Sequence, residues 1–177
     1  MALDAPHALV LAADRQLKWR WLDWLERLLM VLGGGCLAAF SLAVFFDVLT
    51  REIGHPWLWL QEVTSTFFTY GIFIGTAVAT RRNDHLFLAA AAEALSGRVR
   101  MVVEVFNRGV VMLVGLGMLV FGWQNFLSGF GSFRMPSMTP IASLYAAIPL
   151  CGALVALFSL EQIVNGIRHG FAREDAP

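Results

Sequence analysis

Long apolar runs, separated by short polar segments, dominate this chain. A bilayer core about 30 Å thick needs about 20 mostly apolar residues per crossing helix, and four runs are long enough. We therefore predict transmembrane helices at residues 28–49, 60–80, 102–127 and 140–164. Each must be helical, because a lone strand would leave its backbone polar groups unpaired in lipid. The pattern predicts an all-α integral membrane protein, with a single four-helix membrane domain over residues 1–177.

Two further segments are predicted to be helical without crossing the membrane. Residues 16–27 place Leu17, Trp21 and Trp24 near one helical face and charged residues mostly elsewhere. Such an amphipathic N-terminal segment either lies along the headgroups or leads into the first span. Residues 86–95 are alanine-rich and favour a helix. We expect them to form a short interfacial helix between the second and third spans, on the cytoplasmic side.

The composition is too apolar for a soluble domain of this size. The chain is 58% hydrophobic and 15% charged, against about 45–50% and about 25% in typical soluble domains. Its mean hydropathy of +0.65 requires lipid, since small soluble domains keep much of their surface in water. The formal net charge is zero, so nothing points to nucleic acid. Cys36 and Cys151 lie in apolar runs without metal-ligand spacing, and we interpret them as packing residues.

The distribution of basic residues predicts the orientation, because Lys and Arg are enriched in the cytoplasmic flanks of spans. Leaving aside Arg108, which lies within a span, ten basic residues flank one side and two, Arg51 and Arg134, flank the other. Four spans with both termini in the cytoplasm follow. The apolar stretch near residues 8–13 is short and follows Asp4 rather than a basic region, so we expect no cleavable signal peptide.

Ionisable residues in or beside the spans are the first candidates for chemistry, because charges are costly in lipid. All lie within about two turns of a predicted span end: Asp47, Glu62, Glu104, Arg108 and Glu161. Asp47 and Arg51 are four residues apart and share a helix face, and Glu104 and Arg108 repeat that spacing. The structural interpretation is intrahelical pairing, or side chains that reach the interface. The functional alternative, a proton or ion path, needs a charge near the midplane, and no predicted span has one.

No enzyme or cofactor signature is present in the sequence. There is no HExxH, GxSxG, P-loop or GxGxxG motif. His55 and His85 lie at span ends, whereas a membrane b-type haem needs histidines within facing spans. We therefore expect no enzymatic activity, no metal and no cofactor. Gly71 and Gly75 form a GxxxG pair, which lets another helix approach closely and favours a role in packing against other helices.

The stretch from residue 51 to residue 88 carries a family resemblance. An arginine closes the first span, and a tryptophan stands three residues before a glutamate that opens the second. A glycine lies within the second span, and basic residues and a histidine follow it. In order, these are Arg51, Trp59, Glu62, Gly75, Arg81, Arg82 and His85. This layout, with the length and the four spans, resembles the small membrane (Q) subunit of tripartite ATP-independent periplasmic (TRAP) transporters, of the DctQ type. The chain departs from that family in residues 86–92, which are entirely apolar.

The resemblance implies an accessory subunit of the bacterial inner membrane. In such systems a large membrane subunit holds the substrate and sodium sites and moves by an elevator-type mechanism, and a periplasmic binding protein captures the substrate. The small subunit packs beside the scaffold of the large one and helps to anchor it. Family members import organic acids, including sialic acid, by sodium symport. The implied partners are the large TRAP membrane subunit, the periplasmic substrate-binding protein and membrane lipids.

The residues that carry the resemblance are expected to have structural roles at the ends of the second span. Arg51 and Glu62 flank the first periplasmic loop, and either form a bridge that fixes the first helix pair or remain solvated end charges. Trp57 and Trp59 are interpreted as interface anchors. The basic residues after the second span are expected to hold its cytoplasmic end against headgroups or the large subunit. They are Arg81, Arg82 and His85. For the two arginines, the alternative is that they serve only as a positive-inside signal.

Other functions remain open from the sequence. A self-sufficient, homo-oligomeric four-span carrier would need a membrane-embedded carboxylate, and its one candidate, Glu62, lies close to a span end. An unrelated membrane adaptor needs no such group, and a gene beside a large permease gene would separate it from a TRAP subunit. A membrane redox subunit would be coloured by its haem.

Overall fold

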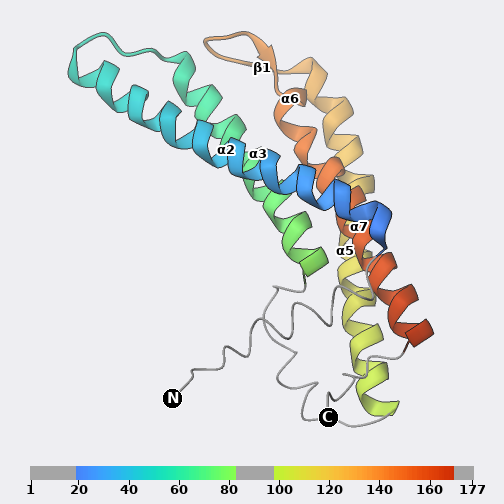
Figure 1. The fold of residues 1–177 in the computed structure, drawn as a ribbon. Helices are drawn as coiled ribbons and strands as arrows, with labels where there is room; N and C mark the ends of the chain where they lie inside the picture. Colours follow the sequence, from blue (N-terminus) through green and yellow to red (C-terminus); the bar gives the residue numbers. More distant parts are fainter. Residues whose placement is uncertain (1–18, 83–97, 170–177) are drawn as a thin grey trace, which may run out of the picture.

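The computed structural model describes residues 19–82 and 98–169 of the chain. The helices that it contains are α2 (Arg20–Glu52), α3 (Trp59–Arg82), α5 (Arg98–Ser128), α6 (Ala142–Tyr145) and α7 (Ala147–His169) (Figure 1). Four helical segments of this described part are long and apolar enough to cross a membrane. The prediction of an all-α membrane protein is confirmed. The short helix predicted at residues 86–95 lies outside the described residues, as does His85.

Helix α2 is longer than a membrane crossing. Its 33 residues extend for about 50 Å at about 1.5 Å per residue, whereas the hydrocarbon core is about 30 Å thick. From Arg20 onward, the amphipathic segment is therefore continuous with the first span in a single helix. The helix ends where Gly54 adopts a φ of +81°, a left-handed conformation that glycine permits at a helix C-terminus. Pro56 follows and separates α2 from α3.

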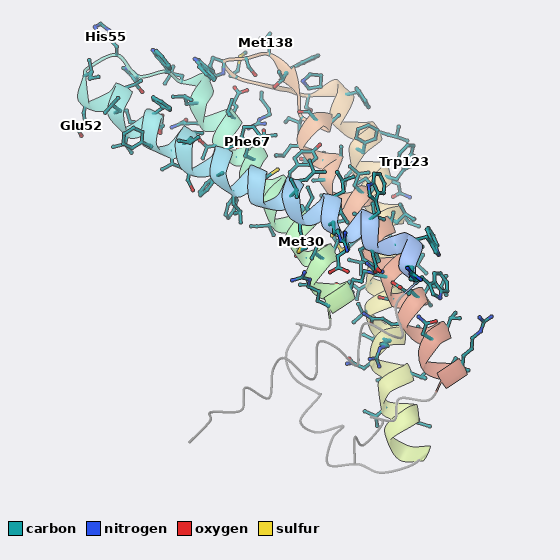
Figure 2. The ribbon with its side chains drawn as sticks, in the orientation of Figure 1. Met30, Glu52, His55, Phe67, Trp123 and Met138 are labelled. Carbon is teal, nitrogen blue, oxygen red and sulfur yellow. The ribbon has the colours of Figure 1, made fainter. Side chains whose placement is uncertain are left out.

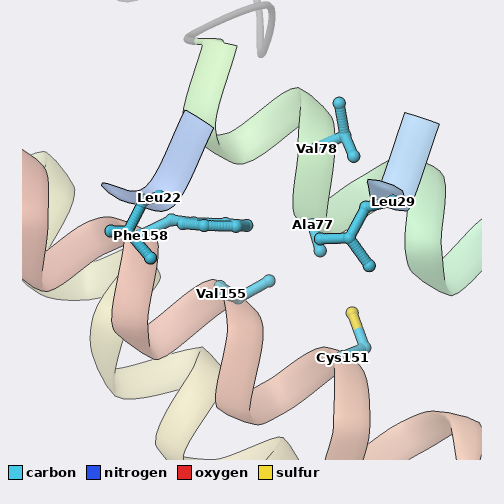
Figure 3. Packing of buried hydrophobic residues seen from close by; sticks show 7 residues of the cluster. All are labelled: Leu22, Leu29, Ala77, Val78, Cys151, Val155 and Phe158. Atoms are coloured by element: carbon cyan, nitrogen blue, oxygen red, sulfur yellow. The ribbon is translucent and has the colours of Figure 1, made fainter. Parts of the chain in front are cut away.

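The helices form two antiparallel pairs that meet through α3 and α7 (Figure 1). Helix α2 packs along α3, α5 packs along α7, and α3 contacts α7 between the pairs. Figure 2 shows His55, in the α2–α3 connection, and Met138, in the connection before α6, at the same end of the molecule. The apolar core lies where the pairs cross (Figure 3), and its buried members are Leu22, Leu29, Ala77, Val78, Cys151, Val155 and Phe158.

A small hairpin in the connection between α5 and α7 was not expected from the sequence. A 3₁₀ turn, η1 (Gly129–Gly131), is followed by strands β1 (Phe133–Arg134) and β2 (Thr139–Pro140). The strands pair antiparallel, with Phe133 opposite Pro140 and Arg134 opposite Thr139. Strands of two residues are too short to produce the alternation that identifies a strand in a sequence.

Close packing by glycine holds the α5–α7 pair together. A Cβ atom on Gly152 would lie 2.5 Å from the Leu119 backbone nitrogen and 2.7 Å from the Gly115 carbonyl oxygen. Small residues allow this approach of two backbones, which supplies much of the attraction between helices in lipid. In the predicted GxxxG pair, Gly71 faces α2 with Cys36 at 3.5 Å from its Cβ position, whereas Gly75 has nothing within 4 Å.

We expect Gly152→Ala to destabilise the protein, because the new methyl group would press on the backbone of α5. Overpacking typically costs about 1–3 kcal/mol, and a backbone neighbour cannot move aside as a side chain does. The apparent melting temperature in detergent, followed by size-exclusion chromatography after heating, should fall. Gly117→Ala is the matched control, because nothing in the described structure lies within 4 Å of its Cβ position. A melting temperature that is equal for both variants would contradict the close packing described here.

Candidate functional site

A buried arginine ends helix α3. The side chain of Arg81 has no exposed surface, and its guanidinium contacts carboxylates from two other helices. Its Nε donates to Glu161 Oε2 at 3.1 Å, Nη1 donates to Glu26 Oε2 at 2.7 Å, and Nη2 donates to Asp23 Oδ1 at 2.8 Å. Charge-assisted bonds of this kind are among the strong hydrogen bonds of proteins. Arg81 therefore joins the end of α3 to the start of α2 and to α7.

Backbone and aromatic groups complete the surroundings of Arg81. Nη1 donates to the carbonyl of Leu22 at 2.9 Å and Nη2 donates to that of Trp19 at 3.2 Å. The guanidinium carbon lies 5.6 Å from the centre of the Phe158 ring, within the range of a cation–π interaction. Every nitrogen of the guanidinium is thus hydrogen-bonded, which is what a buried charge requires.

Glu161 in turn fixes the residue that precedes α2. The Trp19 backbone N–H donates to Glu161 Oε1 at 2.7 Å, and the Trp19 indole N–H donates to Asn165 Oδ1 at 3.0 Å. Helix α7 also bonds to the end of α3, because Gln162 Nε2 donates to the Thr80 carbonyl at 2.7 Å. Three helices are therefore tied together at one end of the molecule by a single network.

The second arginine of this end is only partly buried. Arg82 donates through Nε to Glu26 Oε1 at 2.9 Å, and its side chain is 38% exposed. Glu26 thereby bridges Arg81 and Arg82. The structure corrects the expectation that both arginines face headgroups or another subunit, because Arg81 lies inside the chain. No local sequence pattern predicts that Arg81 pairs with Glu161. Asp23 and Glu26 are easier to single out from the sequence, because they are carboxylates three residues apart in an amphipathic helix.

A second polar cluster lies at the start of α3, around Glu62. Its carboxylate accepts hydrogen bonds from the backbone N–H of Ser137 at 3.1 Å, from the Ser137 hydroxyl, and from the Thr139 hydroxyl at 3.5 Å. The hairpin also donates through Arg134, whose Nη1 bonds to Thr66 Oγ1 at 2.8 Å and whose Nη2 bonds to the Glu62 carbonyl at 3.0 Å. The β1–β2 hairpin is therefore attached to α3 by two sets of hydrogen bonds, one to the Glu62 carboxylate and one from the Arg134 guanidinium.

The predicted bridge between Arg51 and Glu62 is wrong. Arg51 Nη2 lies 3.0 Å from Asp47 Oδ2, so the predicted pairing along α2 is confirmed, while Glu62 is bonded to the hairpin. Local spacing identified the first pair, whereas the hairpin that occupies Glu62 gives no sequence signal. The Glu104 side chain lies outside what the structure describes.

The tryptophans and Gly75 occupy the surface of the described structure. Trp57 and Trp59 are about half exposed, and their rings stack with centroids 6.0 Å apart. Gly75 is exposed and makes no packing contact at its Cβ position. Within residues 19–82 and 98–169, no group of three His, Cys, Asp or Glu side chains is arranged to hold a metal ion.

The two clusters stand about one hydrocarbon thickness apart along α3. From Glu62 to Arg81 the helix rises about 28 Å at about 1.5 Å per residue, close to the core thickness of about 30 Å. Between them the helix carries no Asp, Glu, Lys, Arg or His. Several of its hydroxyls bond to the preceding turn of the same helix, such as Thr69 to Ser65 and Thr80 to Thr76. The polar side chains thus serve to hold helices, and the described part of α3 offers no charge for carrying an ion across the midplane.

These features define a multi-span membrane protein whose polar clusters tie its helices together. The family model for the DctQ component of tripartite ATP-independent periplasmic transporters matches residues 40–169. The chain therefore belongs to this family and is a small membrane subunit of a TRAP transporter. The family is a transporter component and not an enzyme family.

Two curated relatives are similar to this chain. The sialic acid TRAP transporter permease protein SiaT of Haemophilus influenzae (strain 86-028NP) is 24% identical over 81% of this chain. The sialic acid TRAP transporter small permease protein SiaQ of Vibrio cholerae (serotype O1, strain ATCC 39315 / El Tor Inaba N16961) is 26% identical over 70% of this chain. The match spans 24% of the length of SiaT and 75% of that of SiaQ.

We expect Arg81→Ala to destabilise the protein strongly, because it leaves Glu161 buried without its cationic partner. Breaking a buried pair in this way typically costs about 3–5 kcal/mol. The matched control is Arg51→Ala, which removes an exposed pair and should change stability by about 1 kcal/mol or less. Thermal unfolding in detergent checks both variants. Adding Glu161→Leu to Arg81→Met should recover part of the loss, since no buried carboxylate then remains at that position. Equal melting temperatures for Arg81→Ala and Arg51→Ala would refute a supporting role for the cluster.

We expect Arg134→Ala to loosen the β1–β2 hairpin without unfolding the helices. Phe133 is 55% exposed, so chymotrypsin can cleave there once the hairpin separates from α3. Cleavage of a locally opened segment follows the population of the open form, and the rate should rise several-fold, roughly as that population does. Arg51→Ala, at the same end of the molecule, is the control. If both variants are cut at the wild-type rate, Arg134 does not hold the hairpin.

Proposed function

We propose that this chain is the accessory scaffold subunit of a sodium-driven TRAP transporter that imports organic acids. It acts with a large membrane subunit and a periplasmic substrate-binding protein. The main observation behind the proposal is that this chain matches both SiaQ and SiaT. The same region resembles a separate small permease protein and also one quarter of a longer permease protein. A segment that occurs in both forms is expected to work beside the remaining three quarters of the longer protein.

The polar side chains bond to other groups of the same chain, which favours a scaffold role over a transporting one. Arg81 and Glu62 are both bonded within the chain, and a carrier would need such groups free to bind and release cargo. The alternative of a self-sufficient homo-oligomeric carrier loses its one candidate carboxylate, because Glu62 holds the hairpin. Both relatives are named for sialic acid, and we include this sugar acid in the proposed substrate class.

The proposed orientation places both termini in the cytoplasm of a multi-pass inner membrane protein. The α2–α3 connection and the β1–β2 hairpin lie at one end of the molecule (Figure 1), and Arg81 lies at the opposite end of α3. With the Lys and Arg bias on the side of that cluster, the hairpin and the tryptophan pair face the periplasm. The hairpin then lies on the side where the binding protein delivers the substrate.

We expect this chain to co-purify with the large TRAP membrane subunit when the two are co-expressed and extracted in mild detergent. Mass spectrometry of the eluate should show the two in comparable amounts. Sodium-driven uptake of the organic acid in vesicles should then require both chains. A chain that elutes alone as a stable oligomer, and that transports alone, would support the homo-oligomeric carrier instead.

A further inference from the structure

Two hollows, each of about 280 Å³, lie between α2 and α3. Gln61, Thr64 and Phe68 line the first from the side of α3. Gly71, Gly75, Val78 and Arg82 line the second from the same helix. Residues from Leu29 to Asp47 form the opposite wall along α2.

The two hollows follow one another along the α2–α3 pair. Most lining residues of α3 from Gln61 to Arg82 are separated alternately by three and four positions, and Ser65 and Ala79 lie directly beside members of this series. Residues at these spacings lie above one another on a single helix face. The stripe is about 30 Å long at about 1.5 Å per residue, so the two hollows, which we together call the α2–α3 groove, are distributed over a length close to the thickness of the hydrocarbon core. A groove of this length and spacing matches a transmembrane helix.

Two of the four glycines that line this groove make no packing contact at their Cβ positions with the described residues. Gly34 and Gly75 both line it, and neither has a described atom within 4 Å of its Cβ position. A glycine within a helix lowers the stability of that helix relative to alanine. At Gly152 the close packing of α5 on α7 accounts for this loss of stability, but no such packing accounts for it at Gly34 and Gly75. In lipid, glycines on an outer face let a further helix come close.

A polar group in the groove distinguishes a protein occupant from a lipid chain. The hydroxyl oxygen of Thr64 is buried and has no hydrogen-bond partner among the described residues, whereas Ser65 and Thr66 both bond to the Glu62 carbonyl. A lipid acyl chain cannot bond to this oxygen, and a side chain of another helix can. At the opposite end of the groove, the partly exposed guanidinium of Arg82 adds a positive charge.

The outer face of α5 has the opposite character. Every exposed residue from Val105 to Trp123 is a large apolar one, such as Phe106, Leu113 and Phe121. Its glycines with open Cβ positions, Gly109 and Gly117, are partly buried rather than exposed, and no exposed hydroxyl interrupts this surface. It is a surface suited to lipid, which needs neither close backbone approach nor hydrogen bonds.

We propose that the α2–α3 groove receives one transmembrane helix of the large membrane subunit. That helix comes closest at Gly34 and Gly75, where small residues on its own face allow the contact. It carries a hydrogen-bonding side chain at the level of Thr64. This assignment rests on the proposed function, because it names the surface through which the small subunit binds its partner.

Filling the groove tests the assignment. Gly34→Leu and Gly75→Leu place a bulky side chain where the partner helix would lie, at positions where an added Cβ atom meets no described atom within 4 Å. The amount of co-purified large subunit should fall about tenfold, as expected for overpacking at an interface. Gly117→Leu on α5, whose Cβ position is equally open, should leave it unchanged.

The outcomes separate this inference from the proposed function. If the wild-type chain binds the large subunit and the two groove variants bind it equally well, the groove is not the interface and the scaffold proposal stands. If the wild-type chain does not bind, the scaffold proposal itself fails. A loss that is as large for Gly117→Leu as for the groove variants would also contradict an interface specific to this face.

A second measurement avoids any effect of the leucines on folding. A photo-crosslinking phenylalanine analogue at Phe68, which lines the groove and is 45% exposed, should form a covalent adduct with the large subunit. The same analogue at Phe121, which is 66% exposed on α5, should not. An adduct with lipid alone at Phe68 would overturn the proposal and assign the groove to an acyl chain.

Discussion

The buried guanidinium of Arg81 is the interaction on which the arrangement of the helices depends. It contacts Asp23, Glu26 and Glu161, and so fixes the start of α2, the end of α3 and the middle of α7 relative to one another. An arginine enters such a site only when its charge and all its donors are matched. This requirement fixes the start of α2 relative to α3 and α7, and the two hydrogen bonds from Trp19 to Glu161 and Asn165 reinforce the same arrangement. The apolar core that includes Phe158 packs beside this network.

Two different kinds of attraction hold the two helix pairs. Glycines bring α5 and α7 into backbone contact over several turns, which needs no polar group and suits the lipid interior. The α2–α3 pair is joined by the charged cluster around Arg81, while the cluster around Glu62 attaches the other end of α3 to the β1–β2 hairpin. Its glycines at Gly34 and Gly75 remain open. The first pair is therefore closed within the chain, while the second keeps a face that another helix can complete.

Hydropathy predicted the helices because each must bury about 20 apolar residues in lipid. It placed the first span at residues 28–49, whereas α2 is Arg20–Glu52, because charges such as Asp23 and Glu26 end an apolar run without ending a helix. The pair of Asp47 and Arg51 was predictable from a spacing of four. The partnership of Arg81 with Glu161 was not, since the two are 80 residues apart and single-sequence periodicity carries only local information. The count of basic residues even treats Arg81 as a surface charge, although its side chain is fully buried.

A chain whose helices are fixed by these contacts is suited to the role of a rigid, non-moving subunit. Elements that move in a protein are drawn from its least stable parts, with few buried contacts. Here both ends of α3 are fixed by hydrogen-bonded ions, and α7 is fixed by glycine contacts to α5 and by Glu161 to α2 and α3. Sliding α3 by one turn would separate Arg81 and Glu62 from their partners together, and each would then be left in lipid without compensation. Under the proposed function, the moving element of the transporter therefore belongs to the large subunit, and this chain supplies a rigid edge against which that subunit is anchored.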